Sequence, residues 1–139
     1  MKQLRSALVL IAGLLISFAA PARDSVQVID HENVPVVTGS GRPASADAVG
    51  AAIANAAKGG KRVWTVTKVA PDRLQATYHV RQHAIAVNIN YSDKAYSIRY
   101  LSSDNMKFGE MNGVKYIHPF YNNWVEELKR NISAELTRL

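Results

Sequence analysis

The chain has 139 residues and no cysteine, and its 17 lysine and arginine residues exceed its 11 aspartate and glutamate residues, for a formal net charge of +6. The length is that of one domain, and the lack of cysteine excludes disulfides, zinc–thiolate sites and a cysteine nucleophile. The basic residues are scattered and form no stripe, which argues against nucleic acid as a partner. Their excess instead favours anionic neighbours such as lipid headgroups or acidic proteins.

Residues 1–22 have the pattern of a cleavable secretory signal. Lys2 and Arg5 precede an apolar run of about ten to twelve residues, and a small-x-small triplet at residues 20–22 follows that run. The run is shorter than the ~20 residues that cross a bilayer, although an uncleaved membrane anchor remains the alternative. The pattern predicts a protein that is cleaved near Ala22 and works in the periplasm or outside the cell.

Residues 23–44 have mixed character and end in a cluster of Gly, Ser and Pro, so we expect an extended arm with a short edge strand at residues 34–37. Residues 45–139 are predicted to form a single α+β domain. It begins with a helix that Ser45 caps and that the pair at residues 59–60 ends, because Ser favours the N-cap and Gly ends helices.

Four runs of alternating apolar and polar residues follow, at residues 63–69, 74–80, 85–91 and 96–100. Short turns separate them, which predicts a four-stranded antiparallel meander with one buried and one solvated face. Residues 102–117 are expected to form a loop of about sixteen residues, a length that is often functional or folded into a small extra hairpin.

The chain ends in a predicted helix that starts at Pro119. Trp124, Leu128 and Ile132 recur at helical spacing and give it a broad apolar stripe. The predicted element order is therefore α-β-β-β-β-α, and the simplest packing places both helices on the apolar face of the sheet.

Two segments carry a resemblance. Residues 33–38 (NVPVVT) and 116–128 (YIHPFYNNWVEEL) resemble patterns in small exported proteobacterial proteins, most of which are described as hypothetical lipoproteins or uncharacterised periplasmic proteins. The resemblance covers nearly the whole mature chain and implies an exported α+β domain, without catalytic residues. Many such proteins carry a lipid-modified cysteine where this chain has Ala22 and Arg23, so tethering to the membrane does not carry over.

The aromatic residues suggest a ligand pocket between the sheet and the helices. Tyr78, Tyr91 and Tyr96 share the predicted inner face, and Asn122 and Trp124 lie on the last helix. These five residues are the predicted contacts of a small anionic or lipid-like ligand, since ligand pockets combine apolar walls with a few polar groups. The alternative is that the rings are core packing and that Asn122 caps the helix.

Arg81 and Arg99 are expected on the outer face of the sheet, where they would form a positive patch for an anionic surface; ordinary solvation is the alternative. His79 and His83 flank a turn, but a metal site needs a third ligand, and Arg81 between them would repel a cation. No metal, cofactor or catalytic residue is predicted.

The favoured interpretation is a non-catalytic exported envelope protein, a monomer or weak dimer that interacts with an unknown envelope component. The alternative is a periplasmic binder of a small anionic or lipid-like ligand. An enzyme ranks third because no nucleophile, base and orienting group can be assembled. The triplet at residues 30–32 (Asp-His-Glu) does not supply one, since neighbours in an extended chain project to opposite sides.

Overall fold

The computed structural model describes residues 24–139, and the predicted signal at residues 1–22 lies outside them. Its elements, in chain order, are β1 (Val26–Gln27), β2 (His31–Pro35), α1 (Ala46–Gly59), β3 (Thr65–Ala70), β4 (Arg73–Val80), β5 (His83–Tyr91), β6 (Ala95–Asp104), β7 (Gly109–Met111), β8 (Val114–Ile117) and α2 (Phe120–Leu136). The fold is α+β with two helices and antiparallel sheets, as predicted. The predicted strand number and element order are wrong, because eight strands form two sheets and two of them precede α1.

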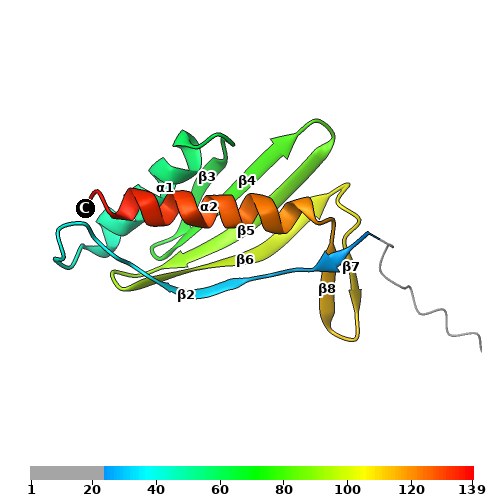
Figure 1. Cartoon of the computed structure of the whole chain (residues 1–139), viewed down its shortest axis with the longest axis horizontal. Helices are drawn as coiled ribbons and strands as arrows, with labels where there is room; N and C mark the ends of the chain where they lie inside the picture. Colours follow the sequence, from blue (N-terminus) through cyan, green and yellow to red (C-terminus); the bar gives the residue numbers. More distant parts are fainter. Residues whose placement is uncertain (1–23) are drawn as a thin grey trace, which may run out of the picture.

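The larger sheet has five antiparallel strands in the order β2-β6-β5-β4-β3 (Figure 1). Strands β3 to β6 are consecutive neighbours and correspond to the predicted meander. The fifth strand, β2, pairs with β6 through an irregular register between His31 and Val34, and Asn33 has a positive φ of 51°. This irregularity and Pro35 obscure the alternation of apolar and polar residues by which a strand is recognised.

The smaller sheet has three strands in the order β1-β8-β7 and replaces most of the loop that was predicted at residues 102–117. Strand β6 extends to Asp104, and β7 and β8 form a hairpin around Asn112 and Gly113. Both turn residues have positive φ, 53° and 77°. A two-residue Asn-Gly turn is a strong hairpin signal, because it matches the twist of the two strands that it joins.

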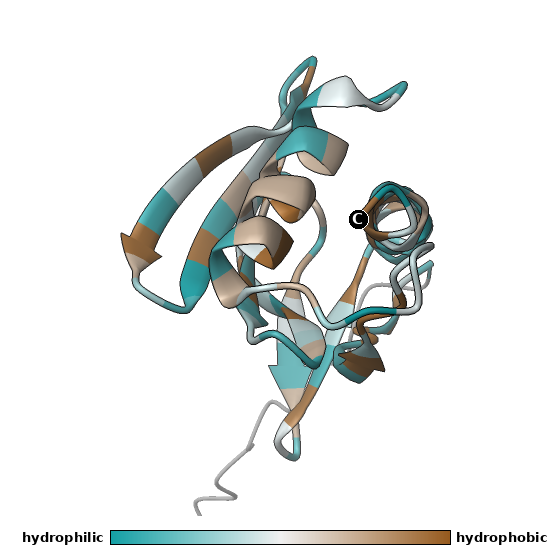
Figure 2. Cartoon of the chain, turned by 90° about the vertical axis from the view of Figure 1, so that its left-hand side faces the viewer, coloured by the Kyte–Doolittle hydropathy of each residue, from teal (hydrophilic) through white to brown (hydrophobic). Residues whose placement is uncertain are grey.

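Both helices lie on the same side of the five-stranded sheet (Figure 2). They enclose one apolar core whose fully buried members include Ile53 of α1, Ile89 and Ile98 of the sheet, and Leu128 and Ile132 of α2. Burial of such side chains contributes roughly 1.5–3 kcal/mol each. The predicted apolar stripe of the last helix therefore faces the core.

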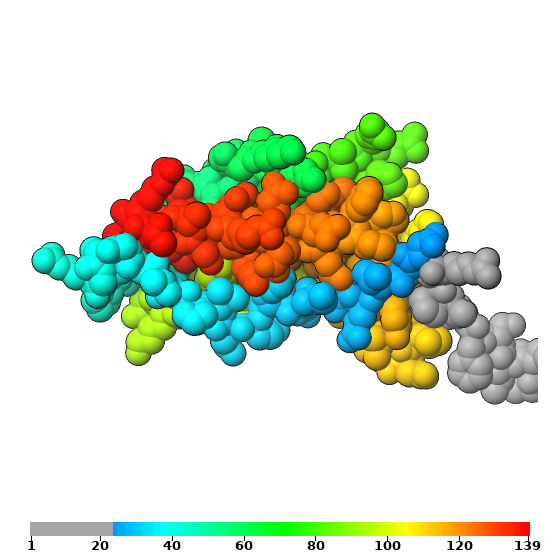
Figure 3. All heavy atoms as spheres, viewed as in Figure 1, coloured from blue at the N-terminus to red at the C-terminus, as the bar shows by residue number. Residues whose placement is uncertain are grey.

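Residues 24–44, blue to cyan in the space-filling view, run along α2 (Figure 3). Strand β1 pairs with β8, and β2 pairs with β6. At the far end of the segment, the Ser40 N–H donates to the carbonyl of Leu139 (3.2 Å). The segment that was predicted as an arm thus supplies an edge strand to each sheet.

Candidate functional site

A cleft of about 420 Å³ lies between the tip of the β4–β5 hairpin and the first turn of α2. We call it the aromatic cleft. Its lining residues are Arg62, Tyr78, Val80, Arg81, His83, Met106, His118, Phe120, Asn123 and Trp124. Of the five residues predicted to bind a ligand, Tyr78 and Trp124 lie here.

Local sequence explains why the hairpin reaches the cleft. Tyr78 and Val80 are two residues apart on β4 and so project from the same face of the sheet. The chain then turns within two residues, where Arg81 adopts a positive φ of 55°, and Val80 pairs with His83. The tight turn places Arg81 and His83 beside the inner-face residues of β4.

Aromatic rings form one continuous wall. The rings of Tyr78 and Trp124 meet edge to face, with centroids 5.2 Å apart and an interplanar angle of 77°. Trp64 lies 5.5 Å behind Tyr78, and Phe120 lies 5.8 Å from Trp124. Trp124 is only 8% exposed, whereas Phe120 is 55% exposed. The wall therefore runs from the core to the surface.

Two arginines border this wall. The Arg62 guanidinium lies 5.9 Å from the ring centroids of both Tyr78 and Trp124, and its Nε is 3.4 Å from the Glu127 carboxylate. Glu127 therefore offsets part of the Arg62 charge. Arg81 is exposed and has no ion-pair partner among residues 24–139. The Arg81 charge thus remains available at the cleft.

The two histidines of the cleft are oriented by the backbone. His83 Nδ1 lies 2.7 Å from the carbonyl oxygen of Asn105, and His118 Nδ1 accepts a hydrogen bond from the Phe120 N–H (3.1 Å). The second bond engages the first backbone N–H of α2, a helix whose first turn contains no acidic residue. The positive end of the helix dipole and Arg81 therefore both favour an anion in this part of the molecule.

Tyr91, another predicted ligand contact, lies away from the cleft. Tyr78 pairs with Ile85, and Tyr91 is six residues further along β5, which corresponds to about 20 Å. The Tyr91 hydroxyl donates to the carbonyl of Pro71 (3.1 Å), and its ring packs against Gly50 of α1. At 6% exposure it is part of the core.

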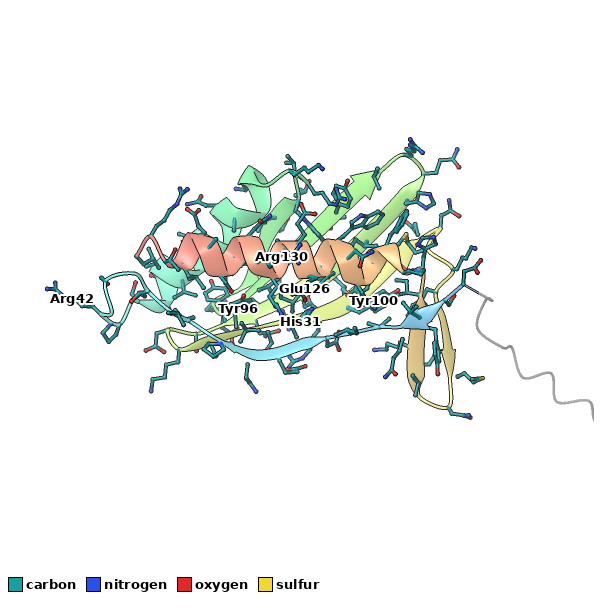
Figure 4. The ribbon with its side chains drawn as sticks, in the orientation of Figure 1. His31, Arg42, Tyr96, Tyr100, Glu126 and Arg130 are labelled. Atoms are coloured by element: carbon teal, nitrogen blue, oxygen red, sulfur yellow. The ribbon has the colours of Figure 1, made fainter. Side chains whose placement is uncertain are left out.

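Tyr96 is likewise enclosed beneath the C-terminal half of α2 (Figure 4). Its hydroxyl donates to the Lys129 carbonyl (3.2 Å) and bonds to the Ser133 hydroxyl (2.8 Å). Its side chain is 1% exposed, and burial raises its pKa above the usual value of 10.0. Tyr91 and Tyr96 therefore pack in the core, which was the alternative to their contact with a ligand.

Asn122 binds the protein's own backbone. Its side-chain amide donates to the carbonyl of Gln27 (2.9 Å) and accepts from the N–H of Ile29 (3.1 Å). The Asn122 side chain thus forms with the segment between β1 and β2 the kind of backbone hydrogen bonds that a neighbouring strand would form. It fastens this segment to the start of α2.

The structure does not bring Arg81 and Arg99 together. Arg99 donates to both carboxylate oxygens of Glu32 on β2 (2.6 Å each), and these hydrogen bonds lower the pKa of Glu32 below 4.5. Arg99 lies opposite Asn88 on β5, whereas the turn that contains Arg81 ends at His83, the first residue of β5. Asn88 and His83 are five residues apart, so about 17 Å of strand separates the two arginine positions. A role of either arginine at an anionic surface stays a prediction.

A cluster on the buried side of β2 is not apparent in the sequence. His31 Nε2 lies 3.6 Å from the carboxylate of Glu126, which also pairs with Lys129 (3.1 Å), and Figure 4 shows His31 and Glu126 facing each other. Burial and the charge of Lys129 lower the pKa of His31 below 6.5, although Glu126 and Asp30 act in the opposite direction. His31 therefore favours its neutral form.

Sequence reasoning also missed most of the cleft. Arg62 and Met106 come from connecting segments, and His118 precedes α2, so no periodic pattern links them. Among residues 24–139, no three potential metal-ligating side chains converge. Neither described helix is long and apolar enough to cross a membrane. Comparisons with protein-family models, curated proteins and solved structures give no match to this chain.

Proposed function

We propose that this protein is an exported, non-catalytic envelope protein whose aromatic cleft binds a small anionic ligand with an apolar part. The observation that carries the proposal is the lining of the cleft, where a continuous ring surface lies beside guanidinium groups. Ligand sites usually combine apolar walls with a few charged or polar groups, and the volume of about 420 Å³ lies in their usual range.

The arginine side chain and the aromatic rings of the cleft suit different parts of such a ligand. Arg81 offers a fork of N–H donors that matches a carboxylate or a phosphate. Tyr78, Phe120 and Trp124 offer apolar surface, so a short hydrocarbon or aromatic group gains from leaving water there. A ligand that has both parts should bind more tightly than either part alone.

Binding is favoured over catalysis by the side chains that line the cleft. The lining residues include no serine, threonine, cysteine or carboxylate, and the Nδ1 atoms of both histidines are engaged by the backbone. These groups can hold an anion, but their only hydroxyl is the Tyr78 phenol, and they supply no aliphatic hydroxyl, thiol or carboxylate nucleophile. The export part of the proposal rests on the predicted signal and is tested by intact-mass analysis of the periplasmic fraction, which should find a chain that begins near Arg23.

Calorimetric titration of delipidated protein tests the binding. The probes are octanoate and octyl phosphate, which have both parts, and acetate and octanol, which each have one. We expect the two anionic amphiphiles to bind at least about tenfold more tightly than octanol, which corresponds to ~1.4 kcal/mol. Equal affinity for octanoate and octanol, or no binding of any probe, would contradict the proposal.

A matched pair of variants locates the charge that matters. Arg81→Gln should reduce the affinity for octanoate to that for octanol. Arg73→Gln removes an exposed arginine at the opposite end of β4 and should leave binding unchanged. Equal losses in the two variants would show that net charge, and not the cleft, attracts the probe.

A further inference from the structure

The five-stranded sheet ends in two edge strands, which differ in how well they are protected against pairing with a further strand. Edge strand β2 contains Pro35 and the bulge at Asn33, two features that discourage a further strand. Edge strand β3, on the left in Figure 2, contains neither proline nor glycine. Its register with β4 is regular from Thr65 to Lys68 and shifts only between Lys68 and Ala70. Along the regular part, the outer row of backbone groups has no strand partner among residues 24–139.

The charge around this edge is mainly positive. Residues 58–73, which run from the end of α1 through β3 to the first residue of β4, contain five lysine or arginine residues and a single acidic residue. Four of the five, Lys58, Lys61, Lys68 and Arg73, are exposed, and none forms an ion pair with another residue of the described chain. A cluster of unpaired positive charge beside an exposed strand attracts an acidic partner.

Apolar side chains accompany the charge. Val63, just before β3, is 65% exposed, and Val69, near its end, is 40% exposed. An added strand places alternate side chains over such positions, so that a partner residue can cover part of this surface.

We propose that β3 accepts an extended acidic segment of a partner polypeptide as a sixth strand of the sheet. Main-chain hydrogen bonds along Thr65–Lys68 supply the pairing, and Lys58, Lys61, Lys68 and Arg73 contact carboxylates of the partner. A second copy of this chain is disfavoured as the occupant, because pairing β3 with itself brings two sets of these charges together. The interaction uses a surface separate from the aromatic cleft.

The test uses synthetic decapeptides and fluorescence anisotropy. One peptide alternates Glu and Val, a second alternates Lys and Val, and a third is the Glu peptide with alternate amide nitrogens methylated so that one edge cannot donate. We expect saturable binding of the Glu peptide only. Equal binding of the Lys peptide or of the methylated peptide, or no saturable binding at all, would overturn the proposal.

Charge reversal provides the matched controls. The double variant Lys61→Glu, Lys68→Glu should weaken binding of the Glu peptide by about tenfold or more, because two attractions become repulsions. The double variant Lys107→Glu, Lys115→Glu makes the same change in charge at exposed positions away from β3 and should have no effect. Circular dichroism verifies that the variants are folded. Equal weakening in both proteins would attribute the binding to net charge and overturn the proposal.

Hydrogen exchange then identifies the surface. The Glu peptide should slow exchange of the amides in residues 65–68 by at least about fivefold and leave residues 118–124 unchanged. Protection confined to residues 118–124 would place the peptide in the cleft and contradict the proposal. Dimerisation that the double charge reversal at Lys61 and Lys68 strengthens, without peptide binding, would show that β3 is a self-pairing edge and would also contradict it.

Discussion

The two ends of the helix–sheet interface both contain tyrosine side chains on the inner face of the sheet, but one end is closed and the other is open. At the closed end, the hydroxyls of Tyr91 and Tyr96 bond to Pro71, Lys129 and Ser133. At the open end, Tyr78 lines the aromatic cleft, and its hydroxyl has no hydrogen-bond partner among residues 24–139.

The difference comes from what the opposite layer provides. Gly50 lets α1 approach the Tyr91 ring closely, and the C-terminal half of α2 lies directly over Tyr96. The start of α2 instead presents Phe120 and Trp124 beside the hairpin tip, and the aromatic cleft lies between these rings and that tip. Tyrosines on the inner face of the sheet therefore pack in the core or line the cleft, depending on which part of the helix layer covers them.

The largest effect is expected for Trp124→Ala. Trp124 is 8% exposed and belongs to the core, although it also lines the cleft. Its loss should cost about 3–5 kcal/mol of the roughly 5–15 kcal/mol that stabilises a domain. Urea unfolding measures this free energy. A loss below ~1 kcal/mol would mean that the open end is not anchored in the core.

A smaller effect is expected for Gly50→Ala at the closed end. A Cβ at Gly50 would lie 2.7 Å from Cζ and from the hydroxyl oxygen of Tyr91. Overpacking costs about 1–3 kcal/mol, and better helix propensity returns up to ~1 kcal/mol, so we expect a net loss of about 1–2 kcal/mol. Gly59→Ala is the control, because no atom lies within 4 Å of its added Cβ. Equal stability of the two variants would contradict the tight packing.

Removal of a single hydroxyl compares the two ends directly. Tyr96→Phe should lose about 1 kcal/mol, because it leaves the Ser133 hydroxyl and the Lys129 carbonyl without this partner. Tyr78→Phe should stay within about 0.5 kcal/mol of the wild type, as substitutions outside such features usually do. Denaturant unfolding of both variants checks this, and the reverse ranking would refute the contrast between the ends.

The smallest effect concerns pH. The pKa of His31 is lowered by burial and by Lys129, so the unfolded chain takes up this proton more readily than the folded protein. The stability that neutral His31 contributes is therefore fully present above the usual pKa of 6.5 and is lost as the pH falls below it. Unfolding at pH 8, 6 and 5 should show a steeper loss in the wild type than in His31→Gln. Parallel profiles would contradict this role.

The sequence predicted the parts of the fold that have regular periods. Alternation located β4, β5 and β6, and the stripe of Trp124, Leu128 and Ile132 located α2. Ser45 caps α1 as predicted, since its hydroxyl accepts from the Ala48 N–H (3.1 Å). Strands β1, β7 and β8 have only two to four residues, which is too short for a period to be recognised.

The candidate site was harder to predict because it depends on tertiary neighbours. The alternation predicted only that Tyr78, Tyr91 and Tyr96 share the inner face of the sheet. Tyr78 lies near one end of the strands, and Tyr91 and Tyr96 lie near the other end. Arg81 was assigned to the outer face by extending the strand alternation, whereas its positive φ turns it to the cleft. Such a backbone conformation is uncommon outside Asn, Asp and Gly, so nothing in the local sequence signalled it.

The most direct test of the account is an NMR titration of ¹⁵N-labelled protein with octyl phosphate. We expect the shift changes to cluster in residues 78–83 and 118–124 at the open end and to saturate together. The amides of Tyr91 and Tyr96 should remain unperturbed, because both side chains are buried and neither lines the aromatic cleft. Changes centred on Tyr91 and Tyr96, or spread evenly over the exposed lysines, would contradict the claim that the open end is the binding site.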